Sequence, residues 1–147
     1  MKVIASGVFD LLHYGHIRFL EEAKKTGGLN AKLIVIVASD ETVTRNKGKS
    51  PIIPENQRRA LVESLKVVDE AILGYKDMDL GKVIQTVNPD IVAVGYDQIE
   101  IEEEVKRIVA EKGYSIKIIR IGRFGNTDLN SSSKIKTRIV EDSGKLV

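Results

Sequence analysis

The two histidines of the chain lie in one tetrapeptide, His13-Tyr14-Gly15-His16. This tetrapeptide follows an apolar run and precedes a helix-like pattern, so it lies where a strand gives way to a helix. Unpaired backbone N–H groups and the helix dipole favour anions at such a position. Two imidazole donors three residues apart, with Gly15 allowing close backbone approach, suit a polyphosphate. The spacing therefore predicts a phosphate-binding site.

A metal site is the alternative use of the same histidines. The chain has no cysteine and no third histidine, so carboxylates such as Asp10 would have to complete the ligand set. Two histidines with one carboxylate leave open coordination positions, which is a different chemistry. We rank the phosphate site above the metal site.

Composition limits what kind of protein this is. The 147 residues are 42% hydrophobic and 30% charged, with a net charge of +2, and they predict one domain over residues 1–147. So small a net charge does not indicate a nucleic-acid partner. Zero cysteines exclude a disulfide framework, and no stretch approaches the roughly 20 apolar residues of a membrane span. The N-terminus has no signal-peptide pattern, so we expect a cytoplasmic protein.

Short apolar runs alternate with helical patterns along the whole chain. The runs predict five strands, at residues 2–6, 32–38, 70–73, 90–94 and 116–121. The patterns between and after them predict helices at residues 16–25, 54–65, 79–87, 101–112 and 131–140. Near-continuous Val/Ile runs are typical of strands buried on both faces. We therefore expect an α/β fold with a doubly wound, parallel five-stranded sheet.

Several polar segments follow predicted strands. The histidines come after the first strand, a basic loop at residues 44–53 after the second, residues 95–98 after the fourth, and Ser131 beyond the fifth. Ligands of open parallel sheets bind beyond the carboxyl ends of the strands, at the point where the strand order reverses. These segments are therefore expected to form one site.

Two of these segments also have an ordinary structural explanation. Lys47 and Lys49 flank Gly48 and could contact phosphates as mobile charges, or they could be part of a solvated surface loop. Ser131 could cap the last helix, bind phosphate there, or do both. The chain has no Walker loop and no dinucleotide-binding glycine motif. A phosphate site without a protein nucleophile matches nucleotidyl transfer, in which the substrate's own phosphate attacks.

Two motifs in the right order carry a family resemblance. The segment at residues 7–16, with His13 and His16, resembles the first signature of the H-x-G-H nucleotidyltransferase superfamily, in its cytidylyltransferase-like branch. Residues 130–135, a serine triplet followed by Lys-Ile, resemble the second signature. The resemblance implies a Rossmann-like nucleotidyltransferase fold, a nucleoside triphosphate, a divalent cation such as Mg²⁺, and release of pyrophosphate. Dimers are common in this family, so a homodimer is an assembly that the resemblance allows.

The resemblance also implies roles for residues of this chain. The expected catalytic residues are His13, His16 and Lys47, and the candidate metal ligand is Asp10. The remaining candidates join the two histidines in binding the nucleotide: Val8, Phe9, Tyr14, Gly15, Lys49, Asp97, Ser131 and Ser132.

The base and the acceptor depend on finer features. Glycerol-3-phosphate cytidylyltransferases carry an arginine before the serine triplet, where this chain has Asn126, and Gly-Asp-Asp-Trp where it has Gly95-Tyr96-Asp97-Gln98. Gly-x-Asp-Gln resembles instead the archaeal-type FAD synthases, which join ATP and FMN into FAD and pyrophosphate. The alternatives are a CTP-dependent cytidylyltransferase acting on glycerol 3-phosphate or a related alcohol phosphate, a nucleotide-sensing module, and a metal-dependent hydrolase.

Overall fold

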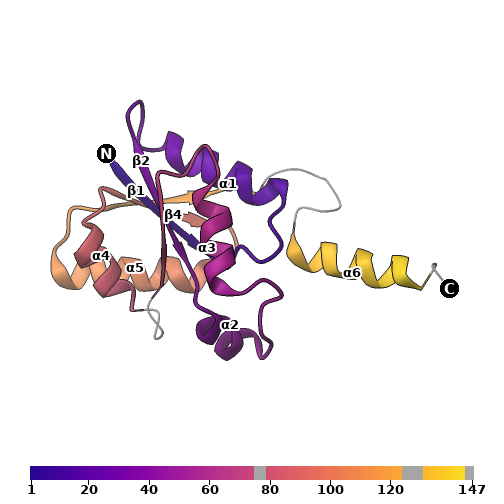
Figure 1. Cartoon of the computed structure of the whole chain (residues 1–147). Coiled ribbons are helices and arrows are strands. Elements are labelled where there is room, and N and C mark those ends of the chain that lie inside the picture. The colour runs from indigo at the N-terminus through magenta and orange to yellow at the C-terminus, as the bar shows by residue number, and fades with distance from the viewer. Residues whose placement is uncertain (75–78, 124–130, 145–147) are drawn as a thin grey trace.

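The computed structural model describes residues 1–74, 79–123 and 131–144 (Figure 1). The strands are β1 (Lys2–Gly7), β2 (Lys32–Val37), β3 (Glu70–Leu73), β4 (Ile91–Gly95) and β5 (Lys117–Ile121). The helices are α1 (Tyr14–Lys25), α2 (Asp40–Lys47), α3 (Glu55–Glu63), α4 (Leu80–Val87), α5 (Ile99–Lys112) and α6 (Ser132–Ser143). No helix in these described ranges is long and apolar enough to cross a membrane.

The five strands form one parallel sheet in the order β3-β2-β1-β4-β5. The predicted α/β class with a doubly wound five-stranded sheet is therefore confirmed. The chain winds outward from β1 to β3, and then returns to the other side of β1 with β4. The strand order reverses between β1 and β4, which places the expected ligand site at their carboxyl ends.

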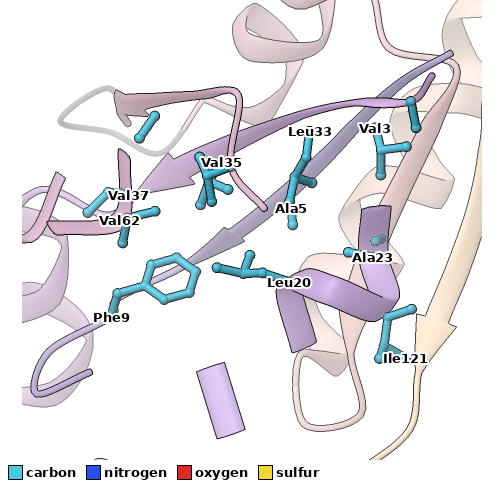
Figure 2. Close-up of a cluster of buried hydrophobic side chains, with 14 of the residues drawn as sticks. Val3, Ala5, Phe9, Leu20, Ala23, Leu33, Val35, Val37, Val62 and Ile121 are labelled. Carbon is cyan, nitrogen blue, oxygen red and sulfur yellow. The ribbon is translucent and has the colours of Figure 1, made fainter. Parts of the chain in front are cut away.

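Alternate side chains of the strands enter two hydrophobic cores. On one face, Val3 and Val35 pack with Leu20 of α1 and Val62 of α3 (Figure 2). On the other face, Ile4, Ile34 and Ile36 pack with apolar residues of α4 and α5. Because each inner strand is buried on both faces, its sequence is continuously apolar rather than alternating.

The sequence analysis was wrong about residues 44–47, which it assigned to an irregular loop. They form the end of α2. The residues that begin and end this helix are recognisable from its own short stretch of sequence. Ser39 caps the helix by accepting a hydrogen bond from the Thr42 N–H, and Gly48 ends it with a left-handed φ of 71°. The helix has eight residues and little apolar periodicity, so the hydrophobic pattern alone does not reveal it. The irregular segment is correspondingly shorter and begins at Gly48.

The final helix, α6, differs from the other helices in its surroundings. None of its residues is buried, and it extends away from the sheet in Figure 1. Its N-terminal turn nevertheless contacts the loop after β1, because the Ser132 hydroxyl donates to the Asp10 carbonyl oxygen. The turn with the second signature is therefore positioned beside the first signature.

Candidate active site

A pocket of about 480 Å³ lies at the carboxyl ends of the strands, where the strand order reverses. Almost every residue proposed from the sequence lines it: Val8, Phe9, Asp10, His13, Gly15, His16, Lys47, Lys49, Asp97, Ser131 and Ser132. Tyr14 is the exception, because its side chain is 67% exposed and lies outside the pocket lining. Segments that are more than 120 residues apart in the chain thus meet at one site, since the Ser132 hydroxyl bonds Asp10 across 122 positions.

The imidazoles of His13 and His16 stack face to face, with 3.8 Å between ring centroids. The backbone N–H of His13 donates to Nδ1 of His16 at 3.2 Å, so the neutral His16 ring holds its proton on Nε2. Both ring nitrogens of His13 are buried, and neither has a hydrogen-bond partner among the described residues. Buried polar atoms normally have partners, so the His13 ring is set up to bond a ligand.

Burial keeps both imidazoles neutral. Burial lowers the pKa of His13. Burial, and then the unfavourable electrostatic interactions of a protonated ring with the neighbouring His13 and with Lys47, lower the pKa of His16 to about 4. At neutral pH each ring therefore offers one N–H donor without a full charge, in a pocket whose positive charges come from lysines and Arg123.

A phenylalanine supports the position of His16. Phe9 is buried in a left-handed backbone conformation, with φ of 54°, and the centroid of its ring lies 5.3 Å from that of His16 in an edge-to-face arrangement. A Cβ atom on Gly7 would lie 2.8 Å from the Phe9 ring, so residue 7 has to be glycine for this packing. The left-handed turn after β1 thereby places the Phe9 ring against His16.

Asp10 holds the segment that follows α2. Its two carboxylate oxygens accept hydrogen bonds from the backbone N–H groups of Ile52 and Ile53, each at 2.9 Å, and Lys136 Nζ lies 3.5 Å from Oδ2. Burial alone would raise the pKa of Asp10, but these N–H donors and the Lys136 ammonium outweigh it and lower that pKa. Its proposed role as a metal ligand stays a prediction. Within the described ranges, no three His, Cys, Asp or Glu residues are grouped so as to hold a metal.

Arg58 joins several segments of the site through hydrogen bonds, a role that the sequence did not reveal. Its side chain is fully buried and donates to the carbonyl oxygens of Val8, Ala38 and Ile53, each at 2.8 Å. It also bonds Asp40 Oδ1 at 2.6 Å. One guanidinium thus connects the ends of β1 and β2 with the segment before α3. An arginine in an amphipathic helix gives no sequence signal for this role.

The basic residues approach the pocket from two sides. Lys47 ends α2, and Lys49 follows the αL residue Gly48. Lys136 reaches in from α6, four positions after Ser132. Lys136 was not among the residues predicted from the sequence. Its i, i+4 spacing from Ser132 nevertheless places these two residues on one face of the helix. The expected cap is present as well, because Ser131 Oγ accepts from the Lys134 N–H.

The turn after β4 forms another wall of the pocket. Tyr96 and Asp97 lie at its tip, and the Arg123 guanidinium lies 5.9 Å above the Tyr96 ring. Residues 124–130, including Asn126, lie outside the described part of the chain.

A model of the cytidylyltransferase-like family matches residues 4–138, which include both signature motifs and almost all of the pocket lining. The chain belongs to the cytidylyltransferase-like family. This confirms the resemblance inferred from the two motifs.

Members of the cytidylyltransferase-like family with similar sequences come from archaea. A protein named FAD synthase from Aciduliprofundum boonei is 47% identical over 141 residues, which cover 96% of this chain and 91% of that protein. A protein of the same name from Thermoplasma volcanium is 46% identical, covering 99% and 98% respectively. A crystal structure titled as a lipopolysaccharide core biosynthesis protein, also from Thermoplasma volcanium, has a TM-score of 0.76 and 46% identity, covering 85% of this chain and 98% of the other. The similarity thus extends over whole chains, not over a shared motif alone.

Proposed function

We propose that this protein is an FAD synthase, which transfers the AMP group of ATP to FMN and releases pyrophosphate. The observation that carries the choice of substrates is the name shared by the relatives at 46–47% identity, of whose length the match covers 91% and 98%. The pocket supports the reaction class, because stacked imidazole donors, lysines and a serine-capped helix N-terminus converge on a space of about 480 Å³. The glycerol 3-phosphate cytidylyltransferase alternative is not favoured by these relatives.

The reaction needs alignment and charge stabilisation rather than a protein nucleophile. An oxygen of the FMN phosphate forms the new bond to the α-phosphorus of ATP, and the bond from that phosphorus to the bridging oxygen of the β-phosphate breaks. The electron pair leaves with pyrophosphate. A phosphate monoester with a second pKa of about 6 is already an anionic nucleophile at neutral pH, so no general base is required.

The histidines and lysines supply donors and positive charge for this step. His16 presents Nε2–H because its Nδ1 accepts from the backbone, and the unpartnered nitrogens of His13 are available for a phosphate oxygen. Lys47 and Lys49 would offset the charge that develops on the leaving pyrophosphate. Such fixed donors act most strongly in a pocket from which water is largely excluded.

We propose that the divalent cation of this reaction enters with the triphosphate. Both oxygens of Asp10 already accept backbone N–H bonds, and the described residues group no three metal ligands. Mg²⁺ commonly keeps several waters and binds through substrate phosphates. We also propose a cytoplasmic location and a homodimer; size-exclusion chromatography with light scattering tests the dimer.

The test is a matrix of ATP and CTP against FMN and glycerol 3-phosphate, with Mg²⁺, in which pyrophosphate is measured. We expect release with ATP and FMN together. Faster release with CTP and glycerol 3-phosphate would contradict the proposed substrates. Phosphate or pyrophosphate release that needs no acceptor would indicate a hydrolase, and nucleotide binding without any release would indicate a sensing module.

A further inference from the structure

Gln98 lines the pocket, yet its carboxamide bonds the protein on both sides. Its Oε1 accepts from the backbone N–H of Gly95 at 2.8 Å, and its Nε2 donates to the carbonyl oxygen of Ser6 at 2.9 Å. The orientation of the amide is determined by its partners, because one is a donor and the other is an acceptor. We call this pair of hydrogen bonds the Gln98 bridge.

The first half of the Gln98 bridge shapes the turn after β4. The backbone N–H of Gln98 donates to the Gly95 carbonyl oxygen at 3.1 Å, so both backbone polar groups of Gly95 bond Gln98. Tyr96 and Asp97 are the two residues between them and are exposed to the pocket. A Cβ atom on Gly95 would lie 3.2 Å from an Asp97 carboxylate oxygen, which shows how closely the turn is folded.

The second half reaches the loop that carries the histidines. Ser6 is followed by Gly7 and Val8, whose carbonyl oxygens accept from Ala38 N–H at 2.9 Å and from Arg58 at 2.8 Å. Three successive carbonyl groups, at the end of β1 and just beyond it, are thus held by three different segments. Of the three groups that bond these carbonyl oxygens, Gln98 is the one on the β4 side of the point where the strand order reverses.

We propose that Gln98 is a positioning residue for nucleotidyl transfer, which sets the distance between the Tyr96–Asp97 turn and the loop of His13 and His16. The inference rests on the proposed function, in which the Tyr96–Asp97 turn and the loop with the histidines contact different parts of ATP and FMN. Since the carboxamide is already bonded on both sides, Gln98 acts on alignment and not on substrate affinity. Misplacement by about 1 Å can cost about 10²-fold in rate.

Three variants test this. Gln98→Met removes both hydrogen bonds and nearly keeps the volume. Gln98→Glu keeps the acceptor for Gly95 but turns an ionised oxygen toward the Ser6 carbonyl oxygen. Gln85→Met, on the exposed face of α4 outside the pocket lining, is the matched control. We measure kcat and the KM for ATP and for FMN. For Gln98→Met we expect kcat to fall about 10- to 100-fold, with each KM changed less than about threefold and the control unchanged.

Gln98→Glu adds a signature that a merely structural role would not produce. The protonated carboxyl can donate to the Ser6 carbonyl oxygen and restore the bridge, and its position beside that oxygen raises the pKa of the introduced carboxyl. The ratio of variant kcat to wild-type kcat should therefore rise several-fold from pH 8 to pH 5.5. The ratio is used because other titratable and charged groups line the same pocket: Asp10, His13, His16, Lys47, Lys49, Asp97, Arg123 and Lys136.

The outcomes are separable. An unchanged kcat in Gln98→Met, a rise in KM alone, or a flat ratio across pH would overturn the positioning role. A wild-type protein that makes no FAD would contradict the proposed function only. The bridge is then tested by hydrogen exchange, since the Gly95 amide should exchange faster in Gln98→Met than in the Gln85→Met control; equal rates would overturn it.

Discussion

At the residue scale, the site depends on two neutral imidazoles that stack on each other, and one of them, His16, is held in a fixed tautomer. His16 is oriented by the backbone N–H of His13 and by the Phe9 ring, while neither ring nitrogen of His13 has a partner in the part of the chain that the structure describes. A neutral donor costs less to bury than a charged one, and it becomes effective when negative charge develops beside it. The pair is thus better suited to the transition state than to holding free phosphate.

The first prediction follows from that difference. His13→Ala or His16→Ala should lower kcat by about 10²–10³-fold and change the Kd for ATP much less, because the lost donor acts mainly on developing charge. Steady-state kinetics and calorimetric titration with ATP measure the two effects. Equal losses of rate and affinity would show that the histidines only bind the ground state.

The second prediction concerns the pH dependence of stability. The pKa of His16 is about 4 in the folded protein against 6.5 for an ordinary histidine, so unfolding takes up a proton in this window. Stability therefore falls as pH falls from 6.5 to 4, by at most about 3 kcal/mol for this residue. His16→Asn keeps an acceptor for the His13 N–H and should lose less unfolding free energy than wild type between pH 7.5 and 4.5. Parallel losses in urea titrations would contradict the lowered pKa.

At the scale of elements, α2 and the segment after it bring the basic residues to the pocket. The helix ends at Lys47, and the backbone of Ile52 and Ile53 is bonded to Asp10. Of the basic loop predicted over residues 44–53, residues 48–51 lie between these two points.

The third prediction tests the role of Asp10 in holding this segment. Asp10→Asn keeps one acceptor oxygen but turns an amide N–H₂ toward the other backbone N–H, which should cost about 1–3 kcal/mol of unfolding free energy. Amide exchange at Ile52 and Ile53 should become faster without nucleotide. Glu103→Gln, an exposed carboxylate on α5, is the charge-matched control. If the two amides exchange as in wild type and only the Mg²⁺ dependence of turnover changes, Asp10 is a metal ligand instead.

At the scale of the whole molecule, segments from both halves of the doubly wound sheet together form the site. Arg58 joins the ends of β1 and β2, and Gln98 joins the ends of β1 and β4. The catalytic geometry is consequently coupled to the integrity of the fold at the point where the strand order reverses. Substitutions there should affect folding and function to different degrees.

The fourth prediction is that Arg58 is the residue whose loss affects folding most. Arg58→Met should cost about 3–5 kcal/mol, because it leaves Asp40 and several buried carbonyl groups without their donor. Arg58→Lys should be nearly as harmful, since one ammonium cannot reach acceptors on three segments. Arg107→Met, at an exposed ion pair on α5, should cost less than about 1 kcal/mol. Thermal unfolding measures all three, and a stable Arg58→Lys variant would contradict this role.

The sequence predicts the parts of this structure that depend on local patterns. Continuous Val/Ile runs predict the strands, and the two signature motifs predict the location of the pocket and most of its lining. The sequence does not predict long-range hydrogen bonds, which depend on which segments meet. Arg58 bonds Val8, 50 positions away, and Gln98 bonds Ser6, 92 positions away, with no trace in periodicity or spacing. Tyr14 lies within the motif yet faces outward, because neighbouring helical residues point in different directions.

The most direct test of the proposed function follows the α-phosphate of ATP. The wild-type protein is incubated with ATP labelled at the α-phosphate, FMN and Mg²⁺, and the products are separated by chromatography. We predict that the label appears in FAD, in an amount equal to the pyrophosphate released, and that no labelled product forms without FMN. Labelled AMP that forms without FMN, or a flavin fraction without label, would contradict nucleotidyl transfer to FMN.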